Sequence, residues 1–252
     1  MLRGGLAGFV LGILSAILWL PLAEFVTQSS RSRLTLAEAG EWSLPLRQFL
    51  ELLMVKWGGF HEWMLYVGIL PLLLALYTAS LVMRKSVMRN AQSVTTMAWL
   101  WVCLAVAVLF SLGVNGPLFP ILFRSLPGLT VLRVPPRAWF IAGFAVAMLS
   151  AFGVQALLRE ARRPHPWLVL TAVALSMSAL LFGLGGVWVL RGDPETALMQ
   201  AGLVHFALVV PASVGVLLLR AHGRLTPQIF AALCALMVVL TLLPVDGSFY
   251  RV

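Results

Sequence analysis

The sequence predicts an all-α protein, a polytopic transmembrane helix bundle of about seven spans. Of its 252 residues, 61% are hydrophobic and 11% are charged, whereas ordinary soluble domains have roughly 45–50% and about 25%. The apolar residues gather in stretches of roughly 20, the length that a helix needs to cross a bilayer. These stretches lack the alternation of a half-buried strand, and lipid offers backbone groups no partner outside the helix itself. We therefore expect one transmembrane domain.

Seven segments of the chain have the length and apolarity of a membrane span. Pro21 and Glu24 fall near the end of the first, and His205 and Pro211 interrupt the sixth. Residues 1–23 also have the basic start and apolar run of a signal peptide, although the run is long for one, and in both readings the loop that follows lies outside. The segments are residues 4–26, 64–83, 94–114, 138–158, 167–190, 201–219 and 227–244.

Basic residues are densest in the loops that follow the second, fourth and sixth segments. Cytoplasmic loops of membrane proteins carry an excess of Lys and Arg, so we expect these loops inside, with the N-terminus in and the C-terminus out. A positive cytoplasmic rim then explains the formal net charge of +9, and nucleic acid is not an expected partner. The residues concerned are Arg84, Lys85, Arg89, Arg159, Arg162, Arg163, Arg220 and Arg224.

Two long outer loops are expected, at residues 27–63 and 115–137. In the first, apolar residues follow Pro45 at helical spacing, and proline suits the first turn of a helix. This pattern predicts a short helix lying on the membrane surface. Its apolar positions are Leu46, Phe49, Leu50 and Leu53.

The second outer loop combines prolines with arginines and contains no acidic residue. Its prolines exclude an uninterrupted helix, and its apolar residues predict an interfacial or re-entrant element. Arg133 and Arg137 flank a stiff Pro-Pro pair, and Arg124 lies upstream. Arginines beside a span often extend to lipid phosphates. The other interpretation is an anion site, because a guanidinium offers a fixed fork of donors suited to phosphate and outer-face arginines run against the positive-inside tendency.

The signatures of common soluble enzymes are absent from the sequence. It contains no phosphate-binding P-loop, no dinucleotide fingerprint and no nucleophile elbow. His61 and Glu62 lack a second histidine at H-x-x-x-H spacing, so no metal site is predicted. His205 is expected to be a hydrogen-bonded polar group within its span rather than a proton relay.

Three segments carry ordered motifs built on proline, glutamate and arginine. They read LPLAEFVTQSSRS at residues 20–32, YVGILPLLLAL at 66–76 and LGVNGPLFPILFRSLPGLTVLRVPPRAWFIAGFAVAMLSAFG at 112–153. In this order they resemble the bacterial YfhO-type membrane proteins, a family grouped with the GT-C glycosyltransferases. The resemblance implies a multi-pass enzyme of the bacterial inner (plasma) membrane that moves sugar from a polyprenyl-phosphate donor to an acceptor on the outer face. It also implies that Arg133 and Arg137 bind the donor phosphate, with Glu24 and Arg31 at the outer mouth of the same cavity.

The chain resembles an internal or truncated segment of such a protein. The catalytic aspartate of the GT-C enzymes lies in their first outer loop, whereas residues 27–63 contain glutamates and no aspartate. The catalytic residue is therefore unassigned, and a partner chain or further segments are expected to supply the missing carboxylate. No cofactor is assigned, and a need for a divalent metal is left open. The carboxylates present for general base chemistry are Glu24, Glu38, Glu41, Glu51 and Glu62.

Two other functions stay open. One is a non-catalytic membrane subunit, or truncated product, that packs against a catalytic partner. The other is a transporter or flippase for a polyprenyl-linked or anionic lipid, against which stands the lack of a visible inverted repeat. The expected partners are membrane lipids and a polyprenyl-phosphate-sugar donor.

Overall fold

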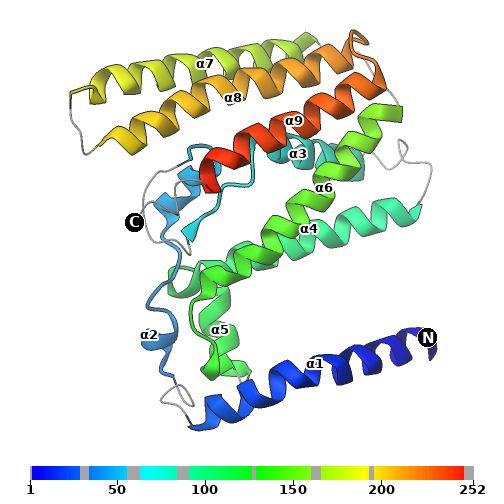
Figure 1. The fold of residues 1–252 in the computed structure, drawn as a ribbon, viewed down its shortest axis with the longest axis vertical. Helices are drawn as coiled ribbons and strands as arrows, with labels where there is room; N and C mark the ends of the chain where they lie inside the picture. Colours follow the sequence, from blue (N-terminus) through cyan, green and yellow to red (C-terminus); the bar gives the residue numbers. More distant parts are fainter. Residues whose placement is uncertain are drawn as a thin grey trace. The chain divides into compact units, whose positions relative to one another are not determined.

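The structure is a computed structural model of the chain, and it describes residues 2–28, 34–55, 63–83, 91–126, 129–159, 166–192 and 196–246. Across these ranges the regular structure is helical without a β-strand, which confirms the predicted all-α class. The chain divides into two compact units. The first unit is Met1–Leu44 with Leu109–Pro136, and the second is Pro45–Val108 with Arg137–Val252. Figure 1 labels the helices of both units.

Four helices within the described ranges are long and apolar enough to cross a membrane. They are α4 (Ala91–Ser111), α6 (Trp139–Arg159), α7 (Pro166–Leu190) and α8 (Ala197–Ala221), with mean hydropathy between 2.0 and 2.2. Shorter apolar stretches lie in α1 (Leu2–Gln28), α3 (Ile69–Met83) and α9 (Pro227–Asp246). The helices therefore support a membrane protein, while the count of seven spans and the orientation of the termini stay predictions.

In the first unit, α1 is apolar around its circumference. Phe9, Leu11 and Ile17 fall on different sides of a helix that turns about 100° per residue, and they are 68%, 65% and 79% exposed. A helix that is apolar all round is suited to a lipid environment rather than to water. Pro21 lies inside this helix without ending it.

In the second unit, two helix pairs approach closely through glycine. Helices α7 and α8 run side by side (Figure 1), and a Cβ at Gly183 would lie 2.6 Å from the Cβ of Ala207. Helices α3 and α6 also pack together, and a Cβ at Gly153 would lie 2.6 Å from the carbonyl oxygen of Leu74. Small residues permit such backbone contact between apolar helices.

Helix α3 begins at Ile69, later than the residue 64 at which its segment was expected to start. The reason is Gly68, whose φ of 93° lies in the left-handed region that interrupts a helix. Pro71 then falls in the first helical turn, where proline is tolerated. Hydrophobicity alone extends through this point, so it misplaces the boundary.

A buried arginine ties α8 to the end of α6. The Arg220 side chain is 6% exposed. It donates from Nε to the carbonyl oxygen of Leu157 at 2.9 Å, from Nη2 to that of Leu158 at 3.0 Å and from Nη1 to that of Leu225 at 2.9 Å. The last carbonyls of a helix lack partners within it and carry partial negative charge. Arg220, counted in the sequence as a loop cation, is thus a C-terminal cap for α6.

The surface helix expected after Pro45 is a 3-10 helix, η1 (Leu46–Leu52), in the second unit. Its polar residues Gln48 and Glu51 are buried, whereas Leu46 and Leu50 are exposed. In a helix that packs on a core through its leucines, the leucines would be buried and the polar residues exposed, which is the reverse of what is found here. The structure thus shows a short helix after Pro45, while its placement on a membrane surface stays a prediction.

Candidate functional site

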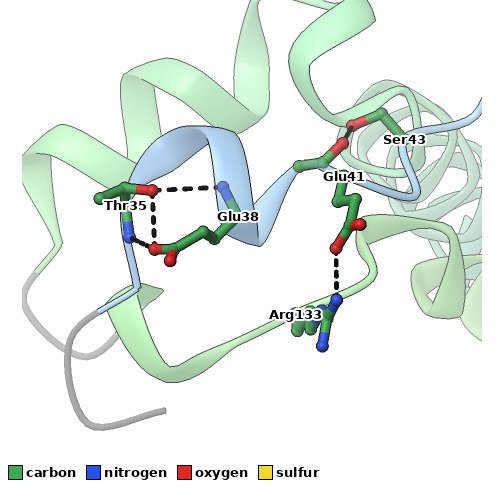
Figure 2. Close-up of polar contacts among 6 residues, drawn as sticks. Thr35, Glu38, Glu41, Ser43 and Arg133 are labelled. Atoms are coloured by element: carbon green, nitrogen blue, oxygen red, sulfur yellow. Dashed lines mark hydrogen bonds and ion pairs between the residues drawn. The ribbon is translucent and has the colours of Figure 1, made fainter. Parts of the chain in front are cut away.

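The candidate site lies in the first unit, where residues 34–44 meet residues 109–136. Helix α2 (Leu36–Ala39) begins with a capping box at Thr35. The backbone N–H of Thr35 donates to Oε2 of Glu38 at 2.7 Å, and Thr35 Oγ1 accepts from the Glu38 backbone at 3.3 Å (Figure 2). The Thr35 hydroxyl also donates to Oε2 of Glu38, at 2.7 Å. The hydrogen bond from the Thr35 backbone, and then the one from its hydroxyl, hold the pKa of the Glu38 carboxyl below its usual value. Glu38 therefore has a structural task.

Ser43 joins this segment to the turn after α4. Its hydroxyl donates to the Gly40 carbonyl at 2.6 Å and accepts from the backbone N–H of Val114 at 2.9 Å. Gly113, with φ at 55°, allows this approach, because a Cβ there would lie 2.7 Å from the Cβ of Ser43. The Asn115 amide adds a bond to the Leu44 carbonyl at 3.0 Å. Glu41 is therefore carried on a segment fixed at both sides.

Glu41 pairs with Arg133 across the two segments. Nη2 of Arg133 donates to Oε2 of Glu41, as Figure 2 shows. The Arg133 side chain is 36% exposed and that of Glu41 is 53% exposed. Nε of Arg133 is buried and has no hydrogen-bond partner among the residues that the structure describes. Nη2 of the guanidinium is thus bound to a carboxylate, and the neighbouring Nε–H is an unsatisfied donor within the described part of the chain.

The backbone after Arg133 has an unusual conformation. Val134 has φ at 65°, a region that β-branched residues rarely adopt, and its side chain is buried. Pro135 and Pro136 follow it and are buried as well. Such conformations cost about 1–3 kcal/mol and cluster at functional sites, where the surrounding structure maintains them. The backbone that follows Arg133 is therefore strained and held in place by the surrounding structure.

The described part of residues 115–137 contains several short helices, in agreement with the prediction that its prolines exclude an uninterrupted helix. They are α5 (Leu118–Ser125), with η3 (Gly113–Asn115) before it and η4 (Leu129–Val131) and η5 (Pro135–Ala138) after it. In α5 the ring of Phe119 is 1% exposed and packs against Phe110 and Phe123, with ring centroids 5.2 and 5.7 Å away. Whether this loop enters the membrane stays a prediction.

The other predicted site residues belong to other elements of the chain or lie outside the described ranges. Arg124 is exposed in the last turn of α5, and Glu24 is exposed on α1. Arg137 belongs to the second unit, where it is exposed in η5. Arg31 lies outside the described residues. The proposed sharing of one cavity by these groups stays a prediction.

Glu41 is the residue that sequence reasoning did not connect with Arg133. It appeared among several candidate carboxylates, and no local pattern distinguished it because its partner is 92 residues away. The structure separates these carboxylates. Glu38 caps α2, and Glu51 is buried in the second unit, where it accepts from Gln48 at 3.0 Å and from the backbone N–H of Leu65 at 3.2 Å.

His205 has the hydrogen bond that the sequence predicted for it. Its Nε2 lies 2.9 Å from the Tyr66 hydroxyl, with the rings in an edge arrangement at a centroid distance of 5.6 Å. The two residues come from α8 and from the segment before α3, so they link elements of the second unit. This contact provides a hydrogen-bond partner for a histidine that lies within an apolar helix.

The described residues contain no group of three or more His, Cys, Asp or Glu side chains that could hold a metal ion. No protein-family model, curated protein or solved structure matched the chain. The chemistry of the site therefore has to be argued from the Arg133–Glu41 pair itself.

Proposed function

We propose that this chain is part of a GT-C-like membrane glycosyltransferase, in which Arg133 binds the phosphate of a polyprenyl-phosphate-linked sugar on the outer face of the bacterial inner membrane. The observation that carries the proposal is the pairing of Arg133 with Glu41. The YfhO-type resemblance of residues 112–153 supports it, because the Arg-Val-Pro-Pro-Arg sequence that holds Arg133 is part of that resemblance.

Arg133 has the properties of a phosphate ligand that is held ready. Its charge is permanent, and its planar fork can contact two oxygens at once. The ion pair with Glu41 is partly exposed, and such pairs contribute only about 0–1 kcal/mol. A phosphate group can therefore displace Glu41 from Nη2 of Arg133 at little cost.

Displacement would prepare Glu41 for proton transfer. Once Arg133 holds phosphate, the Glu41 carboxylate is released from its ion pair and can accept a hydrogen bond from the acceptor hydroxyl. The acceptor hydroxyl oxygen then forms a bond to the anomeric carbon. The bond from that carbon to the phosphate oxygen breaks, its electron pair leaves on polyprenyl phosphate, and the hydroxyl proton passes to Glu41 as general base.

Binding of undecaprenyl phosphate by the purified full chain tests the first part of this mechanism. Arg133→Ala should weaken binding about tenfold or more, because hydrogen bonds to charged groups contribute about 1.5–3 kcal/mol. Glu41→Gln should bind as tightly as the parent or more tightly, because the amide no longer competes for Arg133. Arg47→Ala removes an exposed arginine from η1 and should change nothing.

The pair of variants separates binding from structure. Equal losses of binding in Arg133→Ala and Glu41→Gln would mean that the ion pair only supports the fold, and the phosphate site would be refuted.

Sugar transfer in reconstituted membranes tests the second part of the mechanism, the transfer of the sugar to an acceptor hydroxyl. If binding follows the predicted pattern but no transfer from a polyprenyl-phosphate sugar occurs, the chain is a non-catalytic subunit rather than the enzyme.

A further inference from the structure

A small cavity lies at the turn between α8 and α9, far along the chain from the Arg133–Glu41 pair. It has a volume of about 220 Å³ and is lined by Leu218, Leu219, His222 and Arg224. Pockets that enclose drug-sized ligands measure about 300–1,000 Å³. This cavity is therefore sized for a small anionic group rather than for a nucleotide or a whole sugar chain.

The turn that forms the cavity has a defined backbone. Helix α8 ends in a Schellman motif, in which the N–H of Arg224 donates to the Leu219 carbonyl and that of Gly223 to the Arg220 carbonyl, both at 2.9 Å. Gly223 supplies the left-handed conformation, with φ at 72°. The backbone of Arg224 is thus held against the last turn of α8, so its side chain starts from a fixed position.

The two basic residues of the cavity differ from the neighbouring buried cation. Arg220 is committed to three carbonyl oxygens, whereas Arg224 is exposed. Among the residues that the structure describes, no carboxylate forms an ion pair with Arg224. Nδ1 of His222 lies 2.8 Å from the Leu218 carbonyl, which can only accept, so this nitrogen carries hydrogen. Nε2 is the ring nitrogen left for a ligand.

The location of the cavity indicates where its ligand comes from. Helix α8 is apolar over Ala197–Ala221 and long enough to cross a membrane, so a turn that follows directly falls at the membrane–water boundary. Leu219 is 39% exposed beside the two basic residues. Phosphate groups of lipids occupy that level of a bilayer, and their acyl chains lie beside the apolar helix. Basic pockets next to transmembrane helices bind anionic headgroups in this way.

We propose that this cavity binds the phosphodiester headgroup of an anionic phospholipid, with Arg224 and His222 on the phosphate and Leu219 beside the acyl chain. The proposal does not depend on the proposed glycosyltransferase function. It concerns a ligand that stays with the protein rather than a substrate.

Native mass spectrometry of the full chain in detergent micelles tests this assignment. Dioleoyl phosphatidylglycerol is titrated against the parent protein, and dioleoyl phosphatidylcholine, whose phosphodiester is neutralised by its own choline cation, is the zwitterionic comparison. Arg224→Gln should weaken phosphatidylglycerol binding about fivefold, the effect of one basic residue at an anionic surface. His222→Gln should weaken it in the same direction. Phosphatidylcholine should bind the parent more weakly, and both substitutions should change its binding less than they change phosphatidylglycerol binding.

Arg191→Gln is the matched control. Arg191 is another exposed arginine just beyond an apolar helix, and its guanidinium lies 5.2 Å from the Trp188 ring centroid, outside the cavity. It should leave phosphatidylglycerol binding unchanged, so a loss confined to the cavity variants supports the site. Equal losses in Arg191→Gln and Arg224→Gln would show a non-specific charge effect and overturn it. Displacement of the lipid by an equal concentration of inorganic phosphate would identify free phosphate as the ligand and also overturn the lipid assignment.

Discussion

Replacing Arg220 by Met should destabilise the second unit strongly. The substitution keeps an unbranched apolar stem of similar reach and removes the guanidinium. Three carbonyl oxygens, those of Leu157, Leu158 and Leu225, then lose charge-assisted hydrogen bonds of 2.9–3.0 Å. Two of these oxygens end α6, so the change would expose the unpaired terminus of that helix to an apolar interior.

The size of the effect follows from the bonds that are lost. Hydrogen bonds to a charged group contribute about 1.5–3 kcal/mol each, but burying the guanidinium itself is unfavourable and offsets part of that gain. A net loss of about 3–5 kcal/mol is therefore expected, in the range of other changes that leave buried polar groups unpaired. At about 2–4 °C per kcal/mol for a chain of this size, the melting temperature should fall by about 10 °C.

Thermal unfolding of the purified protein in detergent, followed by tryptophan fluorescence, measures this change. Arg159→Met is the control, because Arg159 is exposed in the last turn of the same α6. It should alter the melting temperature by no more than about 2 °C, as surface substitutions do. If Arg220→Met melts with the control rather than well below it, the capping of α6 by Arg220 is not what holds these helices together.

Two further predictions concern the second unit, beside those for Arg133, Glu41 and Arg224 given above. Gly153→Val should lower the free energy of unfolding by about 1–3 kcal/mol, because a Cβ at this position would lie 2.6 Å from the Leu74 carbonyl oxygen. Gly143→Val on the same helix is the control, since a Cβ there would lie 4.0 Å from Val67. In thermal unfolding, the melting temperature of the control should change little. Burial raises the pKa of the Glu51 carboxyl above its usual 4.5, against the opposing hydrogen bonds from Gln48 and Leu65. The folded state therefore holds that proton more tightly, so stability should fall as pH rises from about 4.5 through the raised pKa. Glu51→Gln should flatten this part of the melting profile, and an unchanged slope would contradict the assignment.

Sequence patterns place some helices closely because composition changes sharply at their ends. The segments expected at 138–158 and 167–190 correspond to α6 and α7 within one residue at each end, since charged loops bound them. The start of α3 is misplaced because Gly68 interrupts the helix by its backbone conformation, which leaves hydrophobicity unchanged.

Of the two residues in the candidate site, the sequence predicts one and not the other. Arg133 stands out locally, as a basic residue among prolines in an apolar loop. Its partner Glu41 does not, because their contact depends on how two distant segments fold together. Glu51 shows the same limit, since helical spacing identified the amphipathic pattern of η1 but not which side is buried. Patterns within one segment are readable, whereas contacts between segments depend on the tertiary structure.

The separation of Glu41 and Arg133 has a consequence for biosynthesis. The two residues are 92 positions apart, and α3 and α4 lie between them in the chain. Translation produces the N-terminal partner first, so Glu41 is made before either helix and long before its arginine. A ribosome-bound chain that ends before residue 133 therefore holds a carboxylate without its cation. The Arg133–Glu41 pair is completed by its last-made segment, and a nascent chain cannot form this ion pair until that segment has been synthesised.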